Sequence, residues 1–137
     1  MGAAMHAESP RFSYLEYDGA KVEALARALF RTPSAGGILV AEIGGKISGM
    51  MAFVVSEHFF SGALVANDLV VYVKPEHRGS SIFTRLVAAF ETWAARLGAV
   101  ELSITPSTGV FIERTAGALK RLGYENYSIG MLKKCAA

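Results

Sequence analysis

Apolar residues recur with helical spacing in three parts of the chain. These parts are residues 19–31, about 81–97 and 106–124. Asp18 stands just before the first stretch, where it suits the N-cap position of a helix. Gly98 follows the second stretch and Gly123 closes the third, as is common at helix C-termini. We expect the third helix to begin with Ser107 or Thr108 as its cap.

Stretches rich in β-branched and other apolar residues alternate with these predicted helices. They are residues 37–43, 46–55, 63–73, 99–105 and 126–134. The first two are separated by Gly44 and Gly45, which predicts a β-hairpin with a two-residue turn. The third is so apolar that we expect it to be buried on both faces, and the fourth is expected to run parallel to it. The order predicts an α/β (α+β) fold with a central mixed sheet and helices on both faces.

Length and composition narrow the class of protein. The 137 residues are 52% hydrophobic and 19% charged, which predicts one globular domain. Basic and acidic residues number 14 and 12, and the net charge of +2 is too small to indicate a nucleic-acid or membrane-surface partner. The longest apolar run, MMAFVV, is much shorter than a membrane-spanning helix, and the sequence opens without the features of a secretion signal. We therefore expect a soluble, cytoplasmic protein.

Cysteine and histidine are too sparse to predict a metal site. Cys135 is the single cysteine, which excludes an internal disulfide and a cysteine-based zinc site. The three histidines, His6, His58 and His77, are far apart and lack the spacing of a zinc motif.

A short polar turn between the third predicted strand and the second predicted helix is the most informative motif. A helix N-terminus has unpaired N–H groups and a partial positive charge, so it binds anions. Arg78 adds a cation whose planar fork matches a phosphate, and Gly79 allows close approach of the backbone. Ser80 and Ser81 can donate hydroxyl groups. The alternative is an ordinary turn, in which Ser81 caps the helix and Arg78 is solvated. The turn has too few glycines for a nucleoside-triphosphate or dinucleotide loop.

Residues 68–104 resemble the acyl-CoA-binding core of GNAT-type N-acetyltransferases. They read DLVVYVKPEHRGSSIFTRLVAAFETWAARLGAVELSI. In that family a strand ending in V-x-P precedes a glycine-rich turn, which begins with arginine or glutamine, and a long helix. The resemblance extends from about Gly37 to the last predicted strand. It implies a single GNAT-like domain over residues 1–137, with a shortened acceptor-side helical segment at 1–36 and the acyl-CoA-binding core at 37–133.

The resemblance also implies that acetyl-CoA is the acyl donor. The backbone at Val71 and Val73 would pair with the pantetheine arm, as a peptide strand adds to a sheet edge. The strand after the helix would splay away to open that edge. The turn at the start of the helix would wrap the pyrophosphate with its amides. The residues of this turn are Arg78, Gly79, Ser80, Ser81, Ile82 and Phe83.

The sequence departs from the family pattern in three places. Ser81 and Phe83 stand where the family has the later small residues of the turn. The tyrosine that often protonates the departing thiolate is replaced by Leu119 or Lys120. The first strand of the family is absent here, which leaves an edge of the sheet unpaired. Another chain or another segment normally covers such an edge, and a homodimer across it is one hypothesis.

The activity that the resemblance implies is direct attack of a primary amine on the thioester while both substrates are bound. A carboxylate would remove the proton of the amine. Asn67 occupies the family's base position and cannot serve. Asp68 would serve only if a β-bulge turned its side chain to the other face. Glu57 and Glu8 are further candidates, and each of the three carboxylates is alternatively a solvated surface group.

Two other functions compete with the enzyme hypothesis, in which the acceptor is a small-molecule amine or a protein amino group. One is a catalytically weak or inactive acyl-CoA-binding sensor or regulatory module, which the missing tyrosine, Asn67 and the shortened N-terminus favour. The other is a globular domain that binds no CoA. Tyr124 and Tyr127 are expected to pack at the end of the sheet, and the alternative is that one of them reaches the thiol as an acid.

Overall fold

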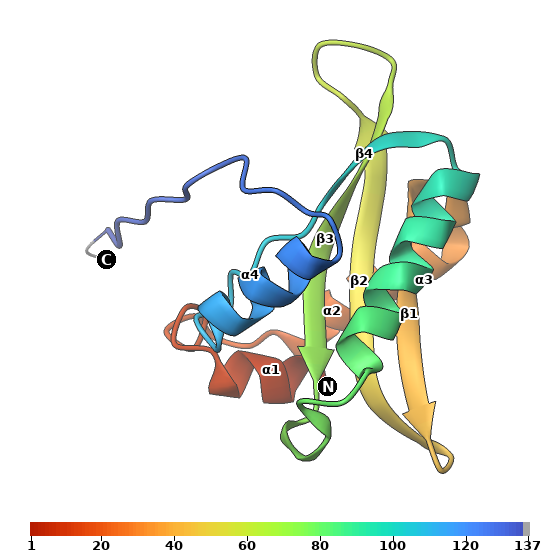
Figure 1. Ribbon diagram of the computed structural model, residues 1–137. Helices are drawn as coiled ribbons and strands as arrows, with labels where there is room; N and C mark the ends of the chain where they lie inside the picture. The colour runs from red at the N-terminus through yellow and green to blue at the C-terminus, as the bar shows by residue number, and fades with distance from the viewer. Residues whose placement is uncertain (136–137) are drawn as a thin grey trace.

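The computed structural model describes residues 1–135, in which four strands form one sheet with helices on both faces (Figure 1). The elements in chain order are α1 Gly2–Glu8, α2 Gly19–Arg31, β1 Gly36–Ile43, β2 Lys46–Glu57, β3 Leu64–Val73, α3 Ile82–Arg96, β4 Ala99–Ser103 and α4 Ile112–Arg121, with short 3₁₀ turns at Pro33–Ala35 and Pro75–His77. The strand order is β1-β2-β3-β4, with β1, β2 and β3 antiparallel and β4 parallel to β3. The predicted mixed sheet is confirmed.

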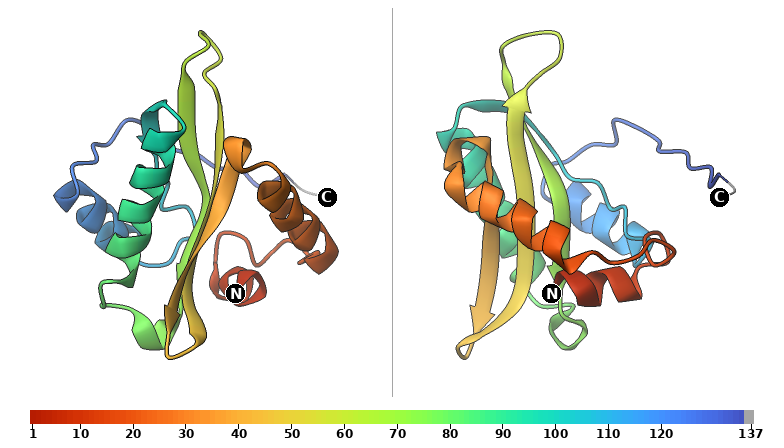
Figure 2. Two further views of the ribbon diagram at one scale, coloured as in Figure 1. Left: turned by 90° about the vertical axis from the view of Figure 1, so that its right-hand side faces the viewer. Right: turned by 180° about the vertical axis from the view of Figure 1, so that it is seen from behind.

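The main core lies between α3 and the sheet. Figure 2 shows α3 on one face and α1 and α2 on the other. Phe53 of β2 and Phe90 of α3 are fully buried, and their ring centroids lie 5.0 Å apart. Trp93 packs edge-on against Phe53, and Leu119 brings α4 into the same core. This packing fixes α3 on the sheet and so holds the start of α3 beside the end of β3.

Local signals in the sequence account for the ends of several elements. The carboxylate of Asp18 accepts a hydrogen bond from the N–H of Lys21, as predicted for the N-cap of α2. Gly44 and Gly45 have φ of 55° and 75°, which a two-residue hairpin turn requires and glycine adopts without strain. Gly98, with φ of 81°, follows α3.

The third predicted helix begins later than expected. α4 starts after Phe111, and neither Ser107 nor Thr108 caps it. Gly109 has φ of 80°, which interrupts any helix through this stretch, and the carbonyl of Thr108 accepts a hydrogen bond from Ser9 Oγ at 2.5 Å. Residues 104–111 therefore form a loop held by the N-terminal segment rather than the first turns of a helix.

The predicted strand at residues 126–134 is wrong. The structure has no strand between residue 122 and residue 135. Tyr127, Ile129 and Met131, which give the segment its alternating pattern, are 72%, 88% and 91% exposed. Alternation specifies the two faces of a strand but supplies no partner edge, and a strand forms only where an edge is available.

The outer edge of β1 has no strand partner among residues 1–135. This agrees with the expectation that the first strand of the resembled family is absent from this sequence. None of the helices in the described part of the chain is long and apolar enough to cross a membrane.

Candidate functional site

β3 and β4 pair over only the first part of β3. Residues 64–67 of β3 form the parallel ladder with β4, and the two strands then diverge (Figure 1). Asp68 lies at the point of divergence, where its Oδ1 accepts a hydrogen bond from the N–H of Thr105 at 2.8 Å. The backbone edge of residues 68–73 therefore has no strand beside it. The expectation that this strand is buried on both faces is wrong, because its second half borders a cavity.

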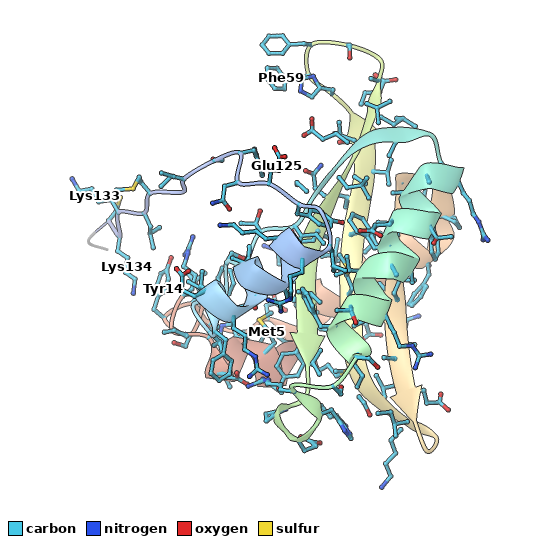
Figure 3. All side chains as sticks on the ribbon, in the orientation of Figure 1. Met5, Tyr14, Phe59, Glu125, Lys133 and Lys134 are labelled. Carbon is cyan, nitrogen blue, oxygen red and sulfur yellow. The ribbon has the colours of Figure 1, made fainter. Side chains whose placement is uncertain are left out.

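The cavity beside this free edge measures about 290 Å³. Its walls come from β3, the turn that follows β3, the loop before α4, one face of α4 and the N-terminal segment. Among the lining residues are Glu8, Phe12, residues 68–73, residues 77–80, Phe83, Thr84, residues 105–108, Phe111, Arg114, Thr115, Ala118 and Arg121. Met5 completes the wall between α1 and α4 (Figure 3).

A β-bulge decides which way the Asp68 side chain faces. Asp68 and Val70 pair with consecutive residues of β2, so Leu69 is an extra residue of β3. In a regular strand, Asp68 and Val71 would face opposite sides of the sheet. The inserted residue places both on the same side, toward α3. The sequence indicated that Asp68 could act as the base only if a β-bulge turned its side chain to the other face, and the structure contains this bulge.

The environment of Asp68 raises the pKa of its carboxyl group from 3.8 to about 6. Burial is the main cause because it disfavours the charged form, and the hydrogen bond from Thr105 N–H partly offsets it. At neutral pH the group is ionised but titrates close to the working range. A carboxylate of this kind suits general base catalysis.

Substitution of Asp68 by asparagine is expected to raise the free energy of unfolding at about pH 7.5 by about 1–2 kcal/mol. The rise in the pKa of Asp68 from 3.8 to about 6 corresponds to roughly 3 kcal/mol, which is the upper limit of this effect. The raised pKa means that the folded protein binds the proton more tightly than the unfolded chain. Stability therefore falls as pH rises from about 4 to about 6, and only the wild-type protein shows this fall. Urea titrations of both proteins at several pH values would measure it. A difference between the two proteins that did not change with pH would exclude the buried charge as its cause.

The other predicted acid–base candidates do not lie as free carboxylates beside Asp68. Glu57 is exposed at the end of β2 and does not line the cavity. Asn67 uses its Oδ1 to accept a hydrogen bond from a serine hydroxyl of β4 at 2.7 Å. Glu8 lines the cavity, but its carboxylate forms an ion pair with Arg78 at 2.6 Å. Asp68 is thus the carboxylate at the divergence of the two strands.

The turn after β3 presents unpaired N–H groups at the start of α3. Gly79 has φ of 90°, a conformation that favours glycine, whereas Ser81 has φ of −77° and fits without strain. The N–H groups of Gly79, Ser81, Phe83 and Thr84 have no protein acceptor within the described part of the chain. The hydroxyl of Ser81 makes no capping hydrogen bond. This backbone arrangement offers several donors to an anion.

Two residues of the predicted pyrophosphate turn have structural contacts instead. Ser80 Oγ donates a hydrogen bond to the carbonyl of His77 at 2.7 Å and accepts one from the N–H of Ile82 at 3.3 Å. The side chain of Ile82 is buried in the core beneath α3. Both residues therefore hold the shape of the turn.

Arg78 is held by the protein. Its Nε donates a hydrogen bond to the carbonyl of Val73 at 3.0 Å, and its Nη2 donates one to Glu8 at 2.6 Å. The guanidinium also lies over the rings of Tyr72 and Phe111, 5.5 and 5.8 Å from their centroids. Arg78 is thus not solvated as in an ordinary turn. It also uses one acceptor position of the Val73 carbonyl, at the strand position that the resemblance assigns to pantetheine.

Arg114 is a site residue that sequence reasoning missed. It lines the cavity from α4, on the same helical face as Ala118 and Arg121. A methyl group at Gly79 would lie 3.2 Å from Arg114 Nη2, so the guanidinium reaches the turn before α3. The spacing of 114, 118 and 121 is the signal that places these residues on one face, but it does not reveal what that face meets.

The predicted position for an acid holds a core residue. Leu119 is 5% exposed in the core, and Lys120 does not line the cavity beside Asp68. The hydroxyl of Tyr124 is buried without a hydrogen-bond partner within residues 1–135, and burial raises its pKa. Tyr124 lines a second cavity next to β4, and Tyr127 is exposed there. No tyrosine of the α4 region lines the cavity that contains Asp68.

A protein-family comparison gives one match. The model described as "Acetyltransferase (GNAT) family" matches residues 3–118 of this chain. Comparison with curated protein sequences gives no significant match.

Solved structures with the same fold share little sequence with this chain. AAC(6')-Iy in complex with the bisubstrate analogue CoA-S-monomethyl-acetylneamine has a TM-score of 0.71 at 18% identity, covering 87% of this chain and 82% of its own. Glucosamine-6-phosphate N-acetyltransferase from Arabidopsis thaliana has a TM-score of 0.71 at 16% identity, covering 97% and 92%. A transcriptional regulator from Bacillus halodurans C-125 has a TM-score of 0.75 at 18% identity, covering 98% and 91%.

Proposed function

This chain belongs to the acetyltransferase (GNAT) family, and we propose that it transfers an acetyl group from acetyl-CoA to a primary amine by direct attack in a ternary complex. The observation that carries the proposal is the free edge of β3 next to the start of α3. That edge can pair with the pantetheine arm as an added strand would. The unpaired amides of Gly79, Ser81, Phe83 and Thr84 can bind the diphosphate.

Asp68 is the proposed base. A primary ammonium with a pKa of about 10.4 must lose a proton, which costs roughly 4–5 kcal/mol at neutral pH. Asp68 is ionised at that pH and takes one proton from the ammonium, directly or through water. The neutral amine then attacks the carbonyl carbon, and the carbon–sulfur bond breaks as the amide forms. The nitrogen loses its second proton in this step, and that proton passes through water to the departing thiolate, since an ordinary thiol has a pKa of about 8.5. Asp68 afterwards releases its proton to solvent.

This route needs no tyrosine acid, which agrees with the buried Leu119 at the predicted position. We propose a small-molecule amine as the acceptor, with a protein amino group as the alternative. The name of the Arabidopsis neighbour and the aminoglycoside-derived analogue bound to AAC(6')-Iy support the first choice.

An acyl-CoA-binding sensor or regulatory module is the second candidate. Two observations favour it: no tyrosine of the described α4 region lines the cavity, and one structural neighbour is named as a transcriptional regulator. Both functions require the chain to bind acetyl-CoA, and only the enzyme transfers the acetyl group to an amine.

Saturation with acetyl-CoA is expected to stabilise the protein against unfolding by roughly 2.7 kcal/mol at a hundred times the dissociation constant. The stabilisation follows because only the folded chain has the free edge and the turn. Thermal unfolding measures it, with adenosine as the control ligand. Release of free CoA thiol with a panel of aminoglycosides, glucosamine 6-phosphate and peptide amines then separates the enzyme from the sensor. If acetyl-CoA gave no more stabilisation than adenosine, both functions would be rejected.

We also propose that the outer edge of β1 is covered by a second copy of the chain. Unpaired edges expose backbone groups, and Val40 and Ile43 of β1 are 54% and 47% exposed. Sedimentation velocity over a range of concentrations tests the proposal, and a species that stayed monomeric throughout would reject it.

A further inference from the structure

We propose that Arg114 of α4, and not Arg78, is the side-chain cation that binds the diphosphate of the acyl-CoA. The inference rests on the proposed acetyltransferase function, because it assigns a residue to the donor that this function requires. It also reverses the role that the sequence suggests for the arginine of the turn.

Arg78 is less available to a phosphate than an unpaired arginine would be. Its Nε and Nη2 already donate to the Val73 carbonyl and to the Glu8 carboxylate. Its charge is neutralised by Glu8, and side-chain exposure in this pair is only 23% and 28%. A phosphate could still reach the N–H groups of Nη1, but it would bring a like charge close to the Glu8 carboxylate, and the ion pair therefore weakens the attraction of Arg78 for an anion. Arg78 therefore joins the end of β3 to the N-terminal segment.

Arg114 reaches the same turn from the opposite wall of the cavity. Its Nη2 lies 3.2 Å from the position that a methyl group on Gly79 would take. Among residues 1–135, its guanidinium has neither an ion-pair partner nor a hydrogen-bond acceptor. The planar fork is therefore free to make two parallel hydrogen bonds to phosphate oxygens.

The residues of the turn explain why an additional cation would help to bind the diphosphate. Ser81 and Phe83 stand where the family's turn has small residues, and the side chain of Phe83 takes up space in the cavity beside the turn. A diphosphate carries a negative charge on each phosphate, and the amides of the turn supply only partial positive charge. A full positive charge from α4 would compensate, with phosphate oxygens accepting hydrogen bonds from Arg114 as well as from the amides of the turn.

The assignment is tested by measuring how tightly the wild type and matched variants bind three acyl-group donors. The donors are acetyl-CoA, its 3'-dephospho form and S-acetylpantetheine, which has no phosphate. Arg114→Ala is expected to weaken binding of both CoA forms by the same factor, roughly 10- to 100-fold. Its binding of S-acetylpantetheine should equal that of the wild type. Arg114→Lys, which keeps the charge without the fork, should give an intermediate loss.

Two further variants serve as comparisons. Arg85→Ala removes a charge from the first turns of α3 but does not line the cavity, so it should bind all three donors like the wild type. Arg78→Ala should weaken all three donors by a similar factor, because it disturbs the strand edge and not the phosphate contact. Arg114 is exposed, and an unchanged melting temperature will show that its variants are folded.

Each other outcome overturns the assignment in a distinct way. A loss in Arg114→Ala seen with acetyl-CoA but not with the dephospho form would move the contact to the 3'-phosphate. An unchanged affinity in Arg114→Ala, with a phosphate-dependent loss in Arg78→Ala, would restore Arg78. Wild-type protein that bound none of the donors would reject the proposed function itself, which separates that failure from failure of the Arg114 assignment.

Discussion

Replacing Asp68 with asparagine is expected to lower kcat for amine acetylation roughly 10²- to 10⁴-fold, the usual contribution of a positioned general base. Asparagine has nearly the same size and can still accept the hydrogen bond from Thr105 N–H, so the divergence of β3 and β4 is retained. It cannot take a proton. KM for acetyl-CoA should be unchanged, because donor binding is assigned to the strand edge and the turn. Steady-state release of free CoA thiol measures both constants.

The pH dependence and a second carboxylate provide the controls. Wild-type kcat/KM should rise with pH through a midpoint at about 6, the pKa of Asp68, and the variant should lack this rise. Glu57→Gln should keep wild-type activity, because Glu57 is exposed and lies outside the cavity. Near-normal turnover in Asp68→Asn would remove Asp68 from the mechanism, and a large loss in Glu57→Gln would reassign the base.

Replacing Gly49 with alanine is expected to lower the free energy of unfolding by about 1–3 kcal/mol and to weaken acetyl-CoA binding roughly tenfold or more. Gly49 pairs with Val73 at the end of β3. Its missing side chain leaves room for α3, since a methyl group there would lie 2.6 Å from Ile82 Cγ2 and 3.3 Å from Leu86 Cδ1. Both side chains are buried, so the start of α3 must move away from the sheet. The amides proposed to bind the diphosphate would move with it.

Gly62→Ala is the matched control for this change. A methyl group at Gly62 meets no atom within 4 Å, so neither stability nor donor affinity should fall. Urea denaturation and calorimetric titration of acetyl-CoA measure the two effects. If Gly49→Ala lost stability but kept full affinity, the position of the α3 N-terminus would not govern donor binding.

The elements from α2 to β4 were predictable because local and long-range preferences agree there. Asp18 caps α2, the Gly44–Gly45 pair satisfies a two-residue turn, and Gly98 follows α3. Each signal acts within a few residues of the element it defines. The apolar stripe of α3 packs against one face of the sheet.

The misses arise where distant contacts decide the structure. The loop before α4 is held by Ser9, 99 residues from its partner Thr108, and a helix pattern cannot reveal such a contact. The pairing of Arg78 with Glu8 spans 70 residues and changes the role of the arginine. The final segment has the alternation of a strand, but none of residues 122–135 is paired in the sheet.

The site was partly predictable for the same reason. The turn, its glycine and the following helix are local features, and the sequence placed them correctly. The bulge at Leu69 has no local signal, because residues 68–73 read as a continuous strand. From the sequence, the bulge could be stated only as the condition under which Asp68 would act as the general base. Arg114 was missed because its approach to Gly79 depends on how α4 packs.

A crystal structure of the protein with acetyl-CoA tests the central claim most directly. We expect the pantetheine arm to lie along the free edge of β3 at residues 70–73, with the diphosphate at the N–H groups of residues 79–84 and the thioester near Asp68. A donor bound elsewhere on the chain, or a segment of protein paired along the full length of that edge, would contradict the account.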